Sequence, residues 1–166
     1  MLPLCLLACR RVVMSTPLIV GGWNVNNFVG DRPSDVAEAT QNFDLLCLQS
    51  TGRKRDEKSS IGGRMYIESG FDDSSPFSNR SCGCGILCGR RIKEANIVNA
   101  WPAPKSVAGR GVAALIRSGY FYLCPIVMYF PQKPKRASAV SGYNMTVKIL
   151  KNWANEILRG LSASSD

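Results

Sequence analysis

The chain has 166 residues, of which 45% are hydrophobic, and a net charge of +9 from 21 lysines and arginines against 12 acidic residues. This length and composition are typical of one globular domain and give no indication of disorder. The sequence contains no histidine. That excludes an imidazole general base, Ser–His or Cys–His activation of a nucleophile, and every zinc site with a histidine ligand. The basic balance favours polyanionic partners such as nucleic acid.

The first residues do not match the pattern expected of a folded domain. Residues 2–9 are apolar, and Arg10 and Arg11 follow them, whereas a secretory signal carries its positive charge before the apolar core. Met14 offers an alternative start. We therefore expect a leader or upstream extension at residues 1–13, a domain at residues 14–160 and a tail at residues 161–166.

The next part of the chain is expected to alternate strands with turns. Apolar runs predict buried strands at residues 18–25 and 43–49, and a proline with two acidic residues predicts a short helix at 33–42 between them. Residues 52–63 are charged and are expected to be a flexible connection. After it we expect a short strand at 64–68, a polar loop at 70–81 and a glycine-containing strand at 82–88.

The rest of the chain is expected to be rich in strands and to end in a helix. The pattern predicts a strand at 92–101, loops at 102–108 and 131–136, and a hairpin of residues 111–117 and 120–130 that turns at Ser118-Gly119. A helix is predicted at 138–159, because apolar residues recur on one face, namely Tyr143, Val147, Leu150, Ala154 and Ile157. This order favours a layered α/β fold over a regular βαβ alternation.

The seven cysteines are expected to be reduced and mostly structural. Cys47 and Cys124 lie in apolar runs and are predicted to be small core residues. Cys82, Cys84 and Cys88 supply three ligands at a spacing unlike the CxxC pairs of structural zinc, so a strand is favoured over a metal site. Free thiols fit a reducing compartment. No apolar run approaches the ~18 residues of a membrane span. We therefore expect an intracellular protein, in cytoplasm or nucleus, without membrane contact.

Several short motifs occur in an order found in a known superfamily. Residues 22–26 have the sequence Gly-Trp-Asn-Val-Asn, and residues 44–50 end in Leu-Gln-Ser. Further matches are at residues 81–87, at residues 109–115, and at Tyr129-Phe130-Pro131 before a helix with a central Trp153. Together these motifs resemble the endonuclease/exonuclease/phosphatase superfamily, and in particular the endonuclease domain of non-LTR retrotransposons. The resemblance covers about residues 17–158.

This resemblance implies a four-layer α/β/β/α sandwich and Mg²⁺-dependent hydrolysis of DNA phosphodiesters, in which an acidic cluster holds the metal. Asn24 matches the asparagine that orients the metal-site carboxylates and the phosphate, and Tyr129 matches the tyrosine that contacts the scissile phosphate. Ser50 stands where the family has its metal-binding glutamate. A serine hydroxyl is neutral and shorter by two bonds, so Ser50 supplies neither the charge nor the reach that Mg²⁺ prefers.

Three basic residues follow the matched tyrosine. Lys133, Lys135 and Arg136 are candidates for contact with a phosphate backbone, and a solvated basic loop is the alternative.

The family's G-D-F-N and S-D-H segments would follow the long helix, and neither occurs in this sequence. We therefore expect a truncated sandwich and an inactive endonuclease-like domain. The alternatives are a residual nucleic-acid-binding module without catalysis and an active phosphodiesterase with different ligands. Truncation is also expected to leave residues 45–48 and 126–130 uncovered, which favours self-association through that face.

Overall fold

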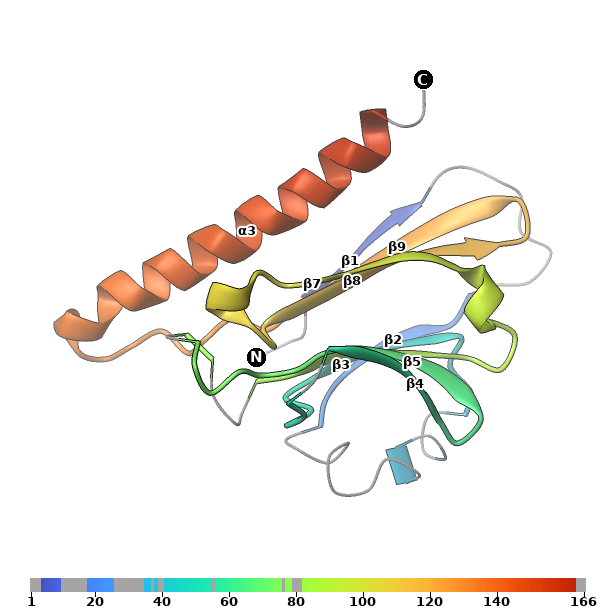
Figure 1. The fold of residues 1–166 in the computed structure, drawn as a ribbon, viewed down its shortest axis with the longest axis horizontal. Coiled ribbons are helices and arrows are strands. Elements are labelled where there is room, and N and C mark those ends of the chain that lie inside the picture. The colour runs from blue at the N-terminus through green and yellow to red at the C-terminus, as the bar shows by residue number, and fades with distance from the viewer. Residues whose placement is uncertain are drawn as a thin grey trace.

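Two β-sheets lie face to face, and the long helix α3 (Val140–Ala163) crosses the outer face of one of them (Figure 1). The computed structural model describes residues 4–9, 18–25, 35–36, 38, 41–54, 56–75, 77–78 and 82–163. The arrangement brings the ends of several strands together at each end of the sandwich (Figure 1).

The sheet beside α3, sheet A, is antiparallel, in the spatial order β1 (Leu4–Cys9), β9 (Phe121–Met128), β8 (Gly111–Ser118) and β7 (Ile97–Pro102). β8 and β9 form the hairpin expected from the sequence, and Gly119 adopts a φ of 61° in its turn. The 3₁₀ helix η1 (Glu94–Asn96) precedes β7 and shortens the strand expected at 92–101. A second, η2 (Lys105–Val107), lies in the expected loop at 102–108.

Strand β1 corrects the expectation that residues 1–13 lie outside the domain. It pairs with β9 in register, from Leu4 opposite Met128 to Cys9 opposite Leu123. A short apolar run is as compatible with a buried strand as with a leader, and periodicity does not separate the two. Residues 4–9 form a strand because the edge of β9 is free to pair with them. That free edge belongs to the tertiary structure and cannot be seen in the sequence of the segment itself.

The second sheet, sheet B, has the spatial order β2 (Val20–Asn24), β3 (Leu45–Gln49), β6 (Cys84–Cys88), β5 (Arg64–Ser69) and β4 (Glu57–Ile61). β2 and β3 are parallel, and the other neighbours are antiparallel. The strands expected at 18–25, 43–49, 64–68 and 82–88 are thereby confirmed. Strands β3 and β6 are buried throughout, because other layers cover the middle of sheet B on both faces. Strand β2 corrects the expectation of a buried strand at 18–25, since it lies at the edge of the sheet and its five residues are half-buried or exposed.

Strand β4 was not expected, since residues 52–63 were predicted to be a flexible connection. β4 pairs with β5 through a turn at Gly62 and Gly63, whose φ values are 56° and 72°. Lys58 and Ser60 of β4 are exposed, so the strand has little of the apolar alternation that marks a half-buried strand. Polar and charged residues are common in an edge strand, where they oppose pairing with other chains.

Helix α3 is four residues longer at its C-terminal end than expected. The expected helix ended at residue 159, whereas α3 continues to Ala163, so the predicted tail at 161–166 is wrong at 161–163. Gly160 costs about 1 kcal/mol of helix propensity, which is not enough to end the helix. No helix among the described residues is long and apolar enough to cross a membrane.

The helix expected at 33–42 is described only in part. Asp35, Val36 and Glu38 are helical, and residues 41–42 form a turn. The remaining residues of that segment lie outside the described part of the chain. Val36 is fully buried against the outer face of sheet B.

Three buried clusters define four layers in the order α/β/β/α, which confirms the expected fold class. The cluster between the sheets includes Leu45, Cys47, Ile67, Ile86, Ala114 and Val127. The cluster between sheet A and α3 includes Ala113, Ile126, Leu150, Trp153 and Ile157. The cluster on the outer face of sheet B includes Val36, Leu46, Leu48 and Tyr66. Adjacent residues of β3 thus alternate between two cores, as the period of a strand requires.

The two apolar runs expected to be uncovered are largely buried within the chain. Leu45–Leu48 are at most 3% exposed, and Ile126, Val127 and Met128 are at most 4% exposed. Tyr129 and Phe130 are half-buried. Burial removes the expected reason for association through these runs, because sheet A covers β3 and strand β1 pairs with β9. Self-association itself stays a prediction.

Candidate functional site

Two of the predicted site residues lie where strands of sheet B end together. Asn24 is the last residue of β2, and its register partner Gln49 is the last residue of β3. Ser50 follows directly. Because β2 and β3 are parallel, their C-terminal ends meet at one edge of the sheet. The backbone amide of Val25 donates to the Gln49 carbonyl at 2.9 Å, so the pairing extends one step beyond β2.

A buried glutamine connects this edge to the third predicted residue, Tyr129. The Gln49 side-chain nitrogen donates to the carbonyl of Met128 at 2.6 Å, and Gln49 is 7% exposed. Tyr129 is the next residue along the chain after Met128. The hydrogen bond therefore crosses between the sheets and brings Asn24, Ser50 and Tyr129 to the same end of the sandwich. The sequence placed Gln49 in a motif but indicated no role for it.

Ser50 sits in a β-bulge. Its φ is 57°, in the left-handed region, and it is 3% exposed. Gln49 pairs with Cys84, while the Thr51 amide already donates to the Gly83 carbonyl at 3.1 Å. One extra residue is thus inserted on the β3 side, which is the definition of a bulge. Beyond the bulge, Thr51 and Gly52 continue the backbone hydrogen bonding to the segment before β6. The extra residue changes the face of the sheet to which the following side chains point.

The bulge requires glycine opposite it. Gly83 has a φ of 114°, and a Cβ there would lie 2.2 Å from Thr51 Oγ1 and 3.0 Å from the Gly52 amide nitrogen. Only glycine adopts this backbone without strain or collision. Ser50 and Gly83 are therefore two parts of one backbone feature.

A buried carboxylate lies beside the bulge. The Glu68 side chain is fully buried, and Oε1 accepts hydrogen bonds from Thr51 Oγ1 at 3.0 Å and from the Tyr66 hydroxyl at 3.3 Å. Arg53 Nε lies 3.1 Å from Oε2. Burial, and then the Glu68 charge, hold the pKa of Tyr66 well above its usual value. The phenol therefore stays protonated and available as a donor.

Glu68 is on the face of β5 that points away from sheet A. Tyr66, two residues earlier, packs in the outer cluster, whereas Ile67 packs between the sheets. Alternation along the strand places Glu68 with Tyr66. The sequence gave Glu68 no special signal, because a single acidic residue in the run Met-Tyr-Ile-Glu-Ser is most often exposed.

Arg110 holds the backbone around Tyr129. It is 6% exposed, its Nε donates to the Phe77 carbonyl, and a terminal nitrogen donates to the Tyr129 carbonyl at 3.5 Å. Its guanidinium carbon lies 5.7 Å from the centre of the Tyr129 ring, a cation–π distance. The Tyr129 amide also donates to the Arg110 carbonyl at 2.8 Å. Arg110 fixes Tyr129 by three kinds of contact, and the motif at residues 109–115 that contains it indicated no role for it.

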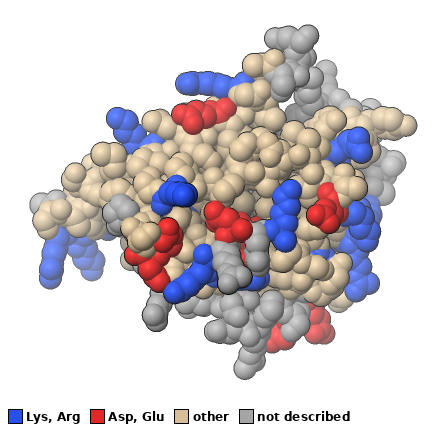
Figure 2. All heavy atoms as spheres, in the orientation of Figure 1, with Lys and Arg blue, Asp and Glu red and all other residues tan. Residues whose placement is uncertain are grey.

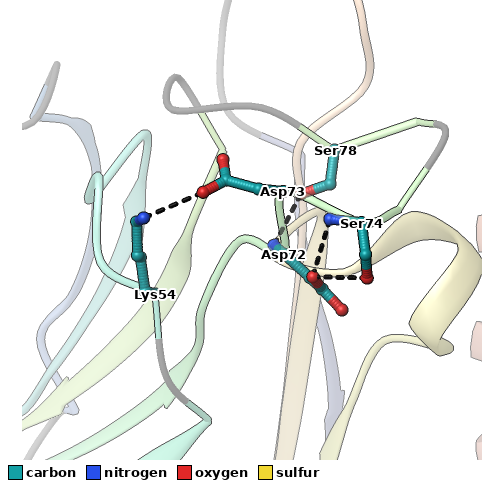
Figure 3. A network of polar contacts seen from close by, with 5 residues as sticks. All are labelled: Lys54, Asp72, Asp73, Ser74 and Ser78. Atoms are coloured by element: carbon teal, nitrogen blue, oxygen red, sulfur yellow. Dashed lines mark hydrogen bonds and ion pairs between the residues drawn. The ribbon is translucent and has the colours of Figure 1, made fainter.

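The loop after β5 borders this end and is held by its own polar groups (Figure 3). The Ser74 hydroxyl and amide donate to one Asp72 oxygen at 2.7 and 2.9 Å, and these bonds hold the pKa of Asp72 below its usual value. The Asp72 amide donates to the Ser78 hydroxyl at 3.1 Å. Lys54 forms an ion pair with Asp73 at 2.8 Å. The charges of this loop are therefore engaged in local contacts.

The three predicted phosphate-binding residues lie apart from these contacts. Lys133, Lys135 and Arg136 are exposed on the segment that joins β9 to the 3₁₀ helix η3 (Ala137–Ala139). Arg136 also accepts a backbone hydrogen bond from Ala139 at 3.1 Å. The segment begins at Tyr129, so its cations are near the candidate site in sequence. Contact with nucleic acid stays a prediction.

Five cysteines are free and buried, as expected for the first and last of them: Cys47, Cys82, Cys84, Cys88 and Cys124. Burial raises the pKa of Cys88 to about 12 and that of Cys124 to about 11, and it also raises the pKa of Cys84. Thiols with such pKa values stay protonated near neutral pH and act neither as nucleophiles nor as ready metal ligands. Cys84 and Cys88 belong to strand β6 and pack between the sheets.

The described residues at this end do not fit the Mg²⁺ ion that the family resemblance implies. Mg²⁺ prefers carboxylate oxygens and water in octahedral geometry. Ser50 is neutral and buried, the Gln49 amide is engaged with Met128, and the Glu68 carboxylate contacts Arg53 and two hydroxyl donors. In the part of the chain that the structure describes, no group of three or more acidic, cysteine or histidine side chains could hold a metal ion.

Comparisons with known proteins give a structural likeness but no match by sequence. No protein-family model matches the sequence, and no curated protein matches it. The fold is similar to the crystal structure of an AP endonuclease from Leishmania major, with a TM-score of 0.49 and 12% sequence identity over 76% of this chain and 43% of that one. This chain therefore spans less than half of that protein. A likeness at this level assigns neither an activity nor a substrate to the chain.

Proposed function

We propose that this chain is a retroelement-type, endonuclease-like domain that acts inside the cell and does not hydrolyse phosphodiesters. The observation that carries the proposal is Ser50. It stands at the position of the family's metal-binding glutamate, it is 3% exposed, and its backbone is left-handed. A buried hydroxyl in a bulge offers Mg²⁺ neither a charge nor an open coordination position.

The direct test is nicking of supercoiled plasmid by the purified 166-residue chain in Mg²⁺ and in Mn²⁺. We expect no nicking above a buffer control. Ser50→Glu should not create activity, because a single carboxylate leaves the nucleophile without activation and catalytic groups act as a unit. Nicking that a chelator abolishes and that a Tyr129→Phe variant reduces would overturn the proposal.

The second candidate function is nucleic-acid binding without catalysis. The exposure of Lys133, Lys135 and Arg136 on one short segment favours it, because cations on the surface near a strand end are well placed for phosphate contacts. Three such contacts would make the affinity strongly dependent on salt.

A charge-matched pair of variants tests this candidate. One variant replaces the three cations of the segment (Lys133→Gln, Lys135→Gln and Arg136→Gln). The control replaces three exposed cations of α3 (Lys148→Gln, Lys151→Gln and Arg159→Gln), so both variants lose a charge of +3. The candidate requires weaker duplex binding and a shallower salt dependence in the first variant only. If both variants bind the duplex equally weakly, the effect comes from net charge alone, and nucleic-acid binding by the 133–136 segment is contradicted.

A further inference from the structure

The end of the sandwich opposite the candidate site carries a cluster of exposed cations and tyrosines. It comprises three adjoining segments: the turn after β6, the residues around η1, and the β8–β9 turn. We call it the distal patch and define it by Arg90, Arg91, Lys93, Arg117, Tyr120 and Tyr122. We propose that the distal patch binds single-stranded nucleic acid, by phosphate contacts from its cations and base stacking on its tyrosines. This function is separate from the proposed function of the candidate site.

Hydrogen bonds join the β8–β9 turn to the η1 segment. Tyr122 lies directly opposite Arg117 in the register of the two strands. The Arg117 carbonyl accepts a hydrogen bond from the Asn96 side chain at 3.0 Å, and the same side chain accepts one from the Lys93 amide at 2.8 Å. Asn96 thus holds Lys93 and Arg117 beside each other on one surface.

The turn after β6 extends the same surface. The Ile92 amide donates to the Gly89 carbonyl at 3.0 Å, which closes the turn that carries Arg90 and Arg91. Arg91 forms an ion pair with Asp44 at 2.5 Å, yet its side chain remains 65% exposed. Burial, and then the nearby charge of Arg90, lower the pKa of Arg64. Like charges are therefore already close together at this end.

The charge of the distal patch is predominantly positive. Two carboxylates lie among its cations, Asp44 in the ion pair with Arg91 and the exposed Glu94. Figure 2 shows lysine and arginine side chains gathered along the right-hand edge of the molecule, over the end with the β4–β5 and β8–β9 turns. A surface of this kind attracts a polyanion and contacts its phosphates.

The tyrosines favour a single strand as the polyanion. Tyr120 is 93% exposed and Tyr122 is 48% exposed, so packing within the chain leaves almost all of the first residue and about half of the second accessible. Exposed aromatic rings beside cations are the elements by which proteins bind unpaired bases, because each base offers a face for stacking. The bases of a duplex are already stacked on each other and offer no such face.

Fluorescence anisotropy with labelled oligo-dT and with a duplex of equal length tests the proposal on the full chain. Tyr120→Ala with Tyr122→Ala should weaken binding to oligo-dT by about tenfold or more, and should leave binding to the duplex within about threefold. Arg90→Gln with Arg117→Gln should weaken both and lower the slope of log affinity against log salt for the single strand by about 1.4. All four residues are at or near the surface, so matching unfolding curves should confirm that the variants fold.

Two controls separate this surface from the candidate site. The variant that lacks Lys133, Lys135 and Arg136 should keep its affinity for oligo-dT. Poly-glutamate of the same charge should bind at least tenfold more weakly than oligo-dT, because it cannot stack. The proposal is overturned if the tyrosine variant binds oligo-dT as the wild type does, or if poly-glutamate binds equally well. It is also overturned if only the variant of the 133–136 segment loses binding.

Discussion

The two ends of the sandwich use their charged side chains differently. At the candidate-site end, Arg53 contacts a buried glutamate, Lys54 pairs with Asp73, and Arg110 binds backbone carbonyls. At the distal patch, Lys93, Arg117 and Tyr120 are exposed, and Tyr122 is about half exposed. Charges of the first kind stabilise loops, whereas charges of the second kind stay available to a partner. At the candidate-site end, the segment after Tyr129 carries charges of the second kind, namely the exposed Lys133, Lys135 and Arg136.

Because of this difference, the end of the molecule that resembles a nuclease family is not the end whose surface is best suited to binding. The motifs that resemble a nuclease family place Asn24, Ser50 and Tyr129 at the candidate-site end, where Arg53 and Arg110 serve internal contacts. The distal patch carries none of those motifs, yet it has the exposed charge and aromatic surface that binding needs. We therefore expect a partner at the distal patch, where exposed cations and aromatic rings lie together, rather than at the end that the resemblance indicates.

The largest expected effect is a contrast between one glycine at each end. Gly83→Ala places a Cβ 2.2 Å from Thr51 Oγ1 at a φ of 114°, whereas Gly119→Ala in the β8–β9 turn meets no atom within 4 Å at a φ of 61°. We expect losses of about 3 kcal/mol or more for Gly83→Ala and about 1 kcal/mol for Gly119→Ala. Urea unfolding measures both free energies. Similar losses of unfolding free energy in the two variants would show that the backbone around Gly83 is no more closely packed than the β8–β9 turn.

The sequence predicted those elements whose pattern is local. The runs that become β3 and β6 are apolar except for Gln49 at the end of β3, and they are buried on both faces. The helical spacing of Leu150, Ala154 and Ile157 places α3 on sheet A. The layer order follows from burying these faces against each other. Nothing beyond short segments of sequence was needed for this part of the fold.

The rest depends on pairing between distant segments. β4 has few apolar residues and exists because β5 offers it a partner, and β1 exists because the edge of β9 is free. At the site, the resemblance indicated Asn24, Ser50 and Tyr129. Gln49, Glu68 and Arg110 were missed because their importance lies in contacts over 79, 17 and 33 residues of sequence.

A smaller effect concerns the ion pair of the distal patch. Burial raises the pKa of Asp44, but the Ile19 amide and Arg91 outweigh it, so the folded pKa is below the usual value. A lowered folded pKa stabilises the protein above the unfolded pKa of about 3.9, and this contribution is lost as pH falls through the folded pKa. Asp44→Asn should therefore cost about 1 kcal/mol at pH 7. The difference between the variant and the wild type should shrink below about pH 3.9.

Unfolding curves of both proteins across this pH range give the measurement. The variant also removes the negative charge that faces Arg91, so it should bind oligo-dT no more weakly than the wild type does. A stability difference that is independent of pH would mean that Asp44 acts by packing rather than by charge.

The smallest expected effect tests the bulge at the candidate site. Ser50 adopts a φ of 57°, which costs a residue with a side chain about 1 kcal/mol, and glycine avoids this cost. Glycine also loses more conformational freedom on folding, and Ser50→Gly should therefore stabilise the chain by only about 0.5 kcal/mol. Thermal and urea unfolding measure the change, with Ser60→Gly on the exposed edge strand β4 as the matched control, which should destabilise. If both variants destabilise the chain equally, the contacts of the Ser50 hydroxyl must outweigh the backbone strain. The serine side chain would then stabilise this end of the sandwich.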